Sequence, residues 1–213
     1  MQIKVDENKL KEIKEKAILN YVPIIAEDSL EYITNLLKEV KPNKILEIGT
    51  AVGYSASNFC RYLNIDEKNN ESYITTIERN EKRFKEASKN IKELQLEEYI
   101  NILYGDALDI LPSLKDNTYD IVFIDAAKGQ YIKFLEEAKR LVKNKGIIIA
   151  DNVLFHGLTL SDSNEHRNRT AVTRLRKFLE LIEEDEMLTS KLIKVGDGLT
   201  ISYINKIKKK EIF

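Results

Sequence analysis

The sequence predicts an α/β fold built around a mostly parallel β-sheet. Short runs of apolar and β-branched residues alternate with longer stretches in which apolar residues recur at the period of a helix. Such alternation is typical of βαβ units, which place their strands parallel to each other. A turn with two glycines follows the first run, and only three residues separate the last two runs. We therefore expect a parallel sheet with an antiparallel edge.

Five apolar runs are expected to form the parallel strands: KILEI (44–48), YITTI (73–77), INILY (100–104), DIVFID (120–125) and GIIIAD (146–151). The helical patterns around them span residues 54–64, 80–94, 107–114, 129–142 and 170–183. Two further runs, LIKV (192–195) and LTISYI (199–204), flank the turn Gly196-Asp197-Gly198. Glycine and aspartate tolerate turn conformations, so we expect these two runs to form a hairpin at the sheet edge.

The first forty residues have the pattern of two helices, KLKEIKEKAILNYV followed by DSLEYITNLLKEV. Asp28 or Ser29 is the expected N-cap of the second helix. We interpret residues 1–40 as a helical extension that packs over the ligand face or a partner, and residues 41–213 as the core. At 213 residues the chain suits one well-packed domain, 1–213, and is marginal for two.

Composition narrows the class of protein further. Hydrophobic residues make up 43% and charged residues 32%, which fits a globular chain with a solvated surface. The net charge of −1 gives no overall field to attract a polyanion, so it neither supports nor excludes RNA binding. The single cysteine, Cys60, is expected to be a small buried side chain. With no leader and no long apolar run, we expect a cytoplasmic protein without a membrane contact.

The glycine-containing turn indicates a nucleotide-like ligand at the carboxyl ends of the strands. Its spacing, Gly49-x-x-x-Gly53, lacks the three glycines of a dinucleotide fingerprint. Glu78 follows the second strand, where a carboxylate can accept two hydrogen bonds from a ribose diol, as for NAD or S-adenosylmethionine. Without a pyrophosphate cradle, and with Glu47 close by, the site favours a ligand with a cationic amino-acid end. The alternative is that both carboxylates only cap nearby backbone N–H groups.

Six stretches resemble, in the same order, class I S-adenosylmethionine-dependent O-methyltransferases of the catechol and caffeoyl-CoA type. They are ILEIGTAVGYSA, TIERNEKR, YGDALDILP, FIDAAKGQY, ADNVLFHG and VGDGLTIS, and they extend over nearly the whole chain. Each stretch alone is weak, whereas their joint occurrence is specific. The resemblance implies a Rossmann-like fold, a seven-stranded sheet in the order 3-2-1-4-5-7-6 with helices on both faces, and S-adenosylmethionine as methyl donor.

Three oxygen ligands are expected at one edge of this sheet. Asp125 ends one predicted strand, and Asp151 and Asn152 follow the next, so their side chains should converge. Such a set suits Mg²⁺ better than zinc, which prefers histidine or cysteine. The resemblance implies that these three residues are the family's metal ligands. The alternative is that the carboxylates only cap helix N-termini.

Lys128 lies three residues beyond Asp125, at the same edge. A lysine beside a divalent cation in a partly desolvated pocket can have its pKa lowered enough to accept a proton. The resemblance implies that Lys128, as general base, and Asp125 are the catalytic residues. The alternative is that the metal alone ionises the substrate hydroxyl while Lys128 holds it.

The resemblance also implies where the cofactor binds. The turn from Gly49 to Gly53, with Ser55, would face the methionine end, Glu78 the ribose, and Asp106 with Ala107 the adenine edge. Asp106 has an alternative role as the N-cap of the following helix. The residues expected to contact the cofactor are Glu47, Gly49, Gly53, Ser55, Glu78, Asp106, Ala107 and Asp125.

The local stretches are most similar to the bacterial branch that methylates 5-hydroxyuridine at the tRNA wobble position, giving 5-methoxyuridine. The 5-hydroxyl and the O4 carbonyl of that base form a catechol-like pair that one Mg²⁺ can bind. This resemblance implies the tRNA anticodon region as substrate, and a homodimer as in dimeric relatives. The stretch HRNRTAVTRLRK (166–177) supplies the expected phosphate contacts, namely Arg167, Arg169, Arg174 and Lys177.

Other hypotheses stay open at this point. The basic stretch has an alternative as an ordinary solvated helix with acidic partners in LELIEEDE. A small-molecule catechol or caffeoyl-CoA O-methyltransferase would use the same chemistry without RNA. A catalytically inactive binding scaffold is a third possibility, against which the three metal ligands and Lys128 argue.

Overall fold

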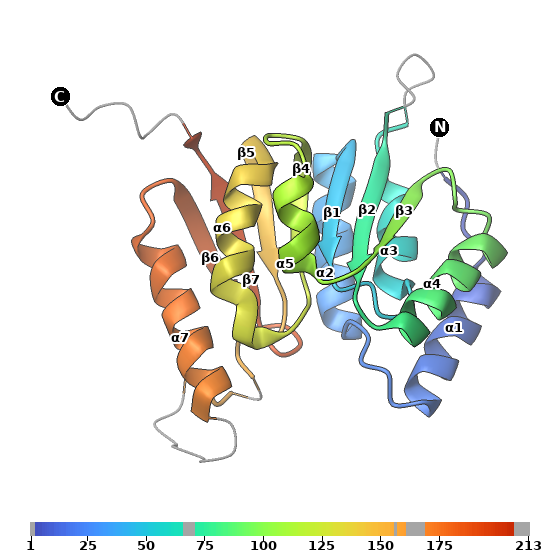
Figure 1. Ribbon diagram of the computed structural model, residues 1–213, viewed down its shortest axis with the longest axis horizontal. Coiled ribbons are helices and arrows are strands. Elements are labelled where there is room, and N and C mark those ends of the chain that lie inside the picture. The colour runs from blue at the N-terminus through green and yellow to red at the C-terminus, as the bar shows by residue number, and fades with distance from the viewer. Residues whose placement is uncertain (1–2, 66–70, 156, 161–168, 207–213) are drawn as a thin grey trace. The chain divides into compact units, whose positions relative to one another are not determined.

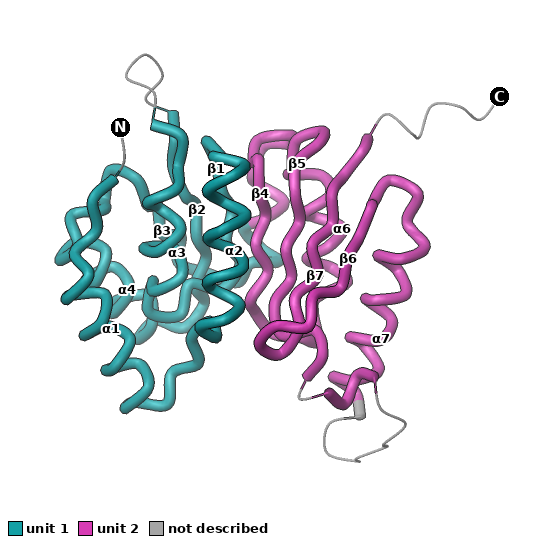
Figure 2. Tube along the Cα trace, turned by 180° about the vertical axis from the view of Figure 1, so that it is seen from behind, with its two compact units in different colours: residues 1–110 teal, residues 111–213 magenta. Residues whose placement is uncertain are grey.

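A computed structural model describes residues 3–65, 71–155, 157–160 and 169–206 (Figure 1). The chain forms two compact units, Met1–Ile110 and Leu111–Phe213 (Figure 2). Within the described ranges, no helix combines the length and the apolar character needed to cross a bilayer.

The first unit holds three parallel strands in the order β3-β2-β1. Their bounds are Lys44–Ile48 for β1, Tyr73–Glu78 for β2 and Ile100–Tyr104 for β3. Apart from their first residues, β1 and β2 are buried along their whole length. Strands that are buried on both faces need apolar side chains at consecutive positions, which explains why these sequences are nearly continuous apolar runs.

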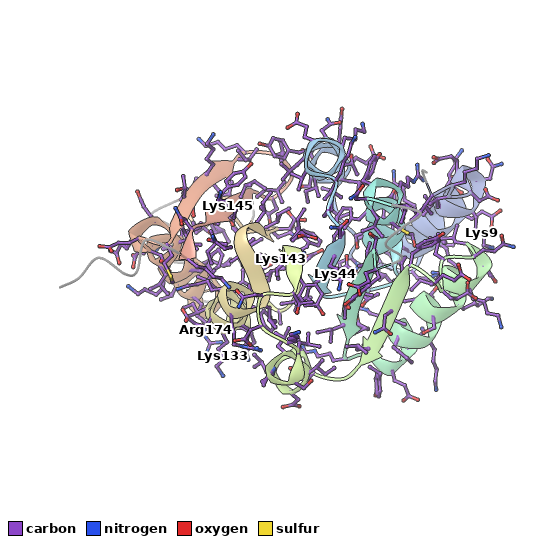
Figure 3. All side chains as sticks on the ribbon, turned by 90° about the horizontal axis from the view of Figure 1, so that it is seen from above. Lys9, Lys44, Lys133, Lys143, Lys145 and Arg174 are labelled. Carbon is purple, nitrogen blue, oxygen red and sulfur yellow. The ribbon has the colours of Figure 1, made fainter. Side chains whose placement is uncertain are left out.

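Helices cover both faces of these three strands. Figure 3 shows α2 and α3 on one face and α4 on the other. Asn80 caps α4, because its side chain accepts a hydrogen bond of 3.0 Å from the Arg83 N–H. The helical elements of this unit are α1 (Glu7–Leu19), α2 (Glu27–Val40), α3 (Tyr54–Phe59), η1 (Cys60–Tyr62), α4 (Glu81–Glu93) and α5 (Ala107–Ile110).

The predicted N-cap of α2 is wrong. The helix begins at Glu27, after an Ala26 cap that makes no side-chain hydrogen bond. Asp28 lies inside the first turn, where its carboxylate accepts a bond of 2.9 Å from the Ser29 N–H. The two acidic residues of this turn face the positive end of the helix dipole, which stabilises the start of the helix without a capping side chain.

The second unit holds the strand order β4-β5-β7-β6. β4 and β5 are parallel, whereas β7 is antiparallel to both β5 and β6. Helices α6 and α7 pack together. The rings of Tyr131 and Phe178 pack edge to face, with 5.5 Å between the ring centroids. The elements are η2 (Leu111–Ser113), β4 (Tyr119–Ile124), η3 (Lys128–Gln130), α6 (Tyr131–Leu141), β5 (Val142–Ala150), α7 (Arg169–Glu184), β6 (Leu188–Ile193) and β7 (Leu199–Ile204).

The predicted hairpin is confirmed, but its first strand lies earlier than expected. β6 ends at Ile193, so the range 192–195 is wrong, because the polar residues that open β6 hid the strand pattern. The strand order reads β3-β2-β1-β4-β5-β7-β6, which confirms the predicted Rossmann-like class. The hairpin turn also binds the chain that follows β5, since the Val153 and Leu154 N–H groups donate to Gly198 and Asp197 carbonyls at 3.0 and 2.8 Å.

Replacing Gly198 with alanine is expected to destabilise the protein more than replacing Gly157. Both glycines have positive φ, +86° and +77°, so either alanine incurs the cost of a left-handed backbone, about 1–2 kcal/mol. At Gly198 the new Cβ would also lie 2.3 Å from Leu154 Cγ, whereas none of the described residues comes within 4 Å of one at Gly157. We expect Gly198→Ala to lose about 1–3 kcal/mol more in urea unfolding. Equal losses would contradict this contact.

Candidate functional site

The register of β4 and β5 brings the predicted metal ligands together in the second unit. Ile124 pairs with Ala150 in parallel strands, so the next residues, Asp125 and Asp151, leave the sheet side by side. The Asp151 N–H donates to the Ile124 carbonyl at 3.0 Å. Asn152 joins the two carboxylates, because its Nδ2 donates to Asp125 Oδ1 at 3.2 Å and its backbone N–H to Asp151 Oδ1 at 2.7 Å.

These two carboxylates are poorly compensated. Asp151 is 1% exposed, and within the described parts of the chain its Oδ2 has no hydrogen-bond partner. Burial raises the pKa of Asp151 to about 7, and the neighbouring charge of Asp125 adds to the rise. Burial also raises the pKa of Asp125, against the opposing effect of Lys128. A buried carboxylate with an unpartnered oxygen, next to a second carboxylate, is the arrangement that a bound cation would stabilise.

The donor set fits a hard divalent cation. The described ranges contain no cluster of three His, Cys, Asp or Glu side chains, so the set at this site is two carboxylates and one amide. Because Asn152 uses its amide nitrogen on Asp125, its amide oxygen is the remaining donor atom. Asn152 also adopts φ of 58°, a left-handed conformation that asparagine tolerates better than most residues. Oxygen donors of this kind suit Mg²⁺ with water filling the other positions.

Lys128 begins η3, and its positive charge lowers the pKa of Asp125 and of Asp151, against the effect of burial. Its Nζ lies 5.4 Å from the centroid of the Phe155 ring, within the range of a cation–π interaction. Phe155 has φ of 47° and belongs to the chain that follows Asn152. Phe155 lies in the stretch ADNVLFHG, but nothing in the sequence singles out its ring as a partner for Lys128.

Tyr131 is a second residue that the sequence analysis missed. Its hydroxyl donates to the Asp151 carbonyl at 2.7 Å, and the side chain is 1% exposed. Burial raises the pKa of Tyr131 well above its usual value, with further contributions from the two carboxylates. The residue therefore stays a neutral donor that fixes the backbone of the ligand loop. A tyrosine on the buried face of a predicted helix is the signal that was available, since such hydroxyls need a partner.

The predicted cofactor residues of the first unit surround its glycine-containing turn. Gly49, Ala51 and Gly53 have φ of 106°, 49° and 80°, which explains the two glycines. The N–H groups of Gly49 and Thr50 both donate to the Ile77 carbonyl, at 3.1 and 3.2 Å. These bonds hold the turn against the end of β2.

Glu78 and Glu47 make different contacts with this turn. Glu78 is 6% exposed and accepts bonds from the Ala51 N–H at 2.9 Å and the Asn80 N–H at 2.8 Å. It therefore caps backbone groups, as its alternative role requires, while each oxygen keeps a second lone pair for a ligand. Glu47 is fully buried and accepts hydroxyl bonds from Ser55 and Thr76. The bond between Glu47 of β1 and Ser55 of α3 thus links the two ends of the turn.

Asp106 and Ala107 follow β3. Asp106 Oδ1 accepts a bond of 2.9 Å from the Leu108 N–H, so the predicted alternative as the cap of α5 is present. The other oxygen lies 3.6 Å from Arg79 Nη1 in an exposed ion pair. Ala107 is buried. Both oxygens of the Asp106 carboxylate therefore already have a partner within the protein.

The basic stretch is only partly described. Arg167 lies outside the described residues, and Arg169 begins α7. Arg174 Nη1 donates to the Gly129 carbonyl at 3.2 Å, and Lys177 pairs with Glu180 at 3.1 Å. The last contact is the acidic partner that the alternative for this helix expects.

Comparison with known proteins places the chain in a family. The family model described as O-methyltransferase matches residues 2–205. The chain belongs to the O-methyltransferase family. Among its relatives is a catechol O-methyltransferase of Niastella koreensis, 30% identical over 182 residues that cover 82% of this chain and 79% of the relative.

Solved O-methyltransferase structures share the fold. A Staphylococcus aureus protein provisionally named a caffeoyl-CoA O-methyltransferase has a TM-score of 0.83 and 33% identity, with 92% of each chain covered. The Bacillus cereus O-methyltransferase, solved in complex with SAH, has a TM-score of 0.82 and 26% identity, covering 94% of this chain and 92% of that one. SAH is what S-adenosylmethionine becomes after methyl transfer. The predicted class, a SAM-dependent O-methyltransferase of the catechol and caffeoyl-CoA type, is confirmed.

Replacing Asp151 with asparagine is expected to separate stability from metal binding. In EDTA at pH 8 the free energy of unfolding of the variant should be about 1–3 kcal/mol higher than that of the native protein, because the variant lacks one of two neighbouring like charges. It should also lose the increase in melting temperature that Mg²⁺ gives the native chain, since the ligand charge is gone. Thermal and urea unfolding with and without Mg²⁺ measure both effects. A Mg²⁺ response equal to that of the native protein would contradict the assigned ligands.

Proposed function

We propose that this O-methyltransferase methylates one of two adjacent oxygens on a small molecule of the catechol or caffeoyl-CoA type, with Mg²⁺ bound by Asp125, Asp151 and Asn152. The observation that carries the proposal is that Asp151 Oδ2 is buried without a partner among the described residues, next to the Asp125 carboxylate. A divalent cation bound there would supply charge that favours the ionised form of a nearby hydroxyl. The relatives that are named catechol and caffeoyl-CoA O-methyltransferases support this substrate class.

Within the second unit, Lys128 is proposed as the residue that takes the substrate proton. The neutral amine of Lys128 would accept the proton, and the ammonium that forms would face the Phe155 ring, whose centroid lies 5.4 Å from Nζ. The charge of Lys128 lowers the pKa of Asp125. Asn152 donates to both carboxylates and so fixes their mutual position. Tyr131 holds the backbone of Asp151, so the ligand loop does not have to reorganise when a cation binds.

Within the first unit, the glycine-containing turn and Glu78 are proposed to bind S-adenosylmethionine, which supplies the methyl group. Glu78 would accept the ribose hydroxyls through the lone pairs that Ala51 and Asn80 leave. Glu47 and Ser55 would act by fixing the turn, since their side chains bond to each other. Contacts of Gly49, Gly53, Asp106 and Ala107 with the cofactor, and of Asp125 with it, are part of the same proposal.

The second candidate function is methylation of 5-hydroxyuridine in tRNA, which the sequence resemblance and the basic stretch favour. The base would present its 5-hydroxyl and O4 to the same ion. Arg174 bonds to Gly129 and Lys177 pairs with Glu180, both at the surface of this chain, and these contacts within the chain favour the small-molecule substrate. The homodimer, the cytoplasmic location and an RNA contact by Arg167 stay predictions.

One assay that compares three substrates decides between the two candidate functions. Purified protein with S-adenosylmethionine and Mg²⁺ is offered a catechol, caffeoyl-CoA or tRNA carrying 5-hydroxyuridine, and products are measured by mass spectrometry. We expect methylation of the small molecules that EDTA or Asp125→Ala abolishes. Methylation of the tRNA alone would establish the second candidate instead.

Lys128→Arg and Lys128→Gln distinguish a proton acceptor from a residue that only holds the substrate. Arginine keeps the positive charge but cannot give up its proton, because its pKa exceeds 12. If Lys128 accepts the proton, both variants should lose about 10²- to 10⁴-fold in kcat. Single-turnover kinetics at saturating substrate measure this loss. Native-like turnover by Lys128→Arg would show that only the charge is needed.

A further inference from the structure

Helix α7 contacts the two loops that carry the second unit's site residues. The first loop leads from β4 into η3 and contains Asp125, Lys128 and Gly129; the second follows Asn152. Arg174 is one of the predicted phosphate contacts, whereas no role was predicted for Arg176. Both arginines donate to carbonyl groups of these loops.

Arg174, labelled in Figure 3, holds the first loop. Its Nη1 donates to the carbonyl of Gly129, the residue next to Lys128, at 3.2 Å. A Cβ on Gly129 would lie only 2.7 Å from that nitrogen. The guanidinium therefore occupies the space beside Gly129 that a side chain would need, and the glycine lets the helix approach closely.

Arg176 holds the second loop at two points. Its Nε donates to the Thr159 carbonyl at 3.0 Å and its Nη2 to the Leu158 carbonyl at 3.1 Å. The planar fork of a guanidinium suits two neighbouring acceptors, which a lysine ammonium cannot reach in the same geometry. Thr159 in turn bonds back to the start of the loop, since its hydroxyl donates to the Val153 carbonyl at 3.0 Å.

The two loops meet at the proposed base. Lys128 comes from the first loop, and Phe155, whose ring lies under its ammonium, comes from the second. The buried face of α7 also contacts this part of the site. Phe178 of α7 packs on the Tyr131 ring, and the Tyr131 hydroxyl donates to the Asp151 carbonyl. The position of Lys128 relative to Phe155 and Asp151 therefore depends on how α7 holds both loops.

We infer that Arg174 and Arg176 are positioning residues, which fix the Lys128 loop and the loop after Asn152 so that the ligand carboxylates and Lys128 keep their mutual geometry. This inference rests on the proposed function for its effect on turnover. The placement of the loops can be measured without it. Arg176 is thereby assigned a role within the fold, not in binding a phosphate.

The test compares Arg174→Lys and Arg176→Lys with a control, Lys133→Arg, which changes an exposed cation of α6 that Figure 3 also labels. The conservative lysine keeps the charge and lets the chain fold, while it removes the fork. Hydrogen exchange of the full-length protein reports each loop directly. Calorimetric titration with Mg²⁺ and steady-state kinetics report the consequences.

We expect Arg176→Lys to speed exchange at residues 157–160 by about tenfold, corresponding to the loss of one charged hydrogen bond. Its Mg²⁺ affinity should fall by a similar factor, and kcat should fall about 10- to 100-fold with KM for S-adenosylmethionine unchanged. Arg174→Lys should speed exchange at residues 128–131 instead, with lower kcat and an unchanged Mg²⁺ affinity. The Lys133→Arg control should match the native protein in all three measurements.

Unchanged exchange of both loops in the two arginine variants would overturn the inference. So would faster exchange spread evenly over the chain, because that pattern indicates general destabilisation and not local positioning. If the native protein binds no Mg²⁺ or transfers no methyl group, the proposed function fails, and the exchange data still decide whether the arginines hold the loops.

Discussion

Two like charges at the end of one pair of parallel strands set the requirements for the second unit. Because Ile124 pairs with Ala150, the residues that follow them, Asp125 and Asp151, lie next to each other. Burial makes the charge of Asp151 costly, as its raised pKa shows, and its Oδ2 lies buried without a partner among the described residues. We propose that a divalent cation balances this pair.

Those contacts hold the carboxylates without neutralising them. Asn152 bonds to both, Tyr131 bonds to the backbone of one, and the Gly196-Asp197-Gly198 turn anchors the residues that follow. Lys128 supplies a positive charge that acts on both carboxylates, and its Nζ lies over the Phe155 ring. The carboxylate oxygens therefore stay available to a ligand. The first unit uses its carboxylates differently, since Glu47 accepts hydroxyl bonds from Ser55 and Thr76, and Glu78 accepts one backbone N–H on each oxygen.

Much of this could be predicted from sequence because it depends on period and order. Strands buried on both faces read as apolar runs, and residues at the ends of neighbouring parallel strands must converge, which located Asp125, Asp151 and Asn152. Contacts that depend on packing could not be predicted. Phe155 under Lys128, the hydroxyl of Tyr131 on Asp151, and the inward direction of Arg176 follow from where loops and helices meet in space. The start of β6 was missed for the opposite reason, since an exposed strand with polar residues lacks the apolar signal.

We propose that the carboxylates of Asp125 and Asp151 form a divalent-cation site in the folded chain. The most direct measurement is titration of the EDTA-treated protein with Mn²⁺, followed by electron paramagnetic resonance, with Mg²⁺ as competitor. We expect one bound Mn²⁺ per chain, displaced by Mg²⁺ and absent from Asp125→Ala. Binding that persists in Asp125→Ala, or no binding by the native protein at millimolar Mn²⁺, would contradict it.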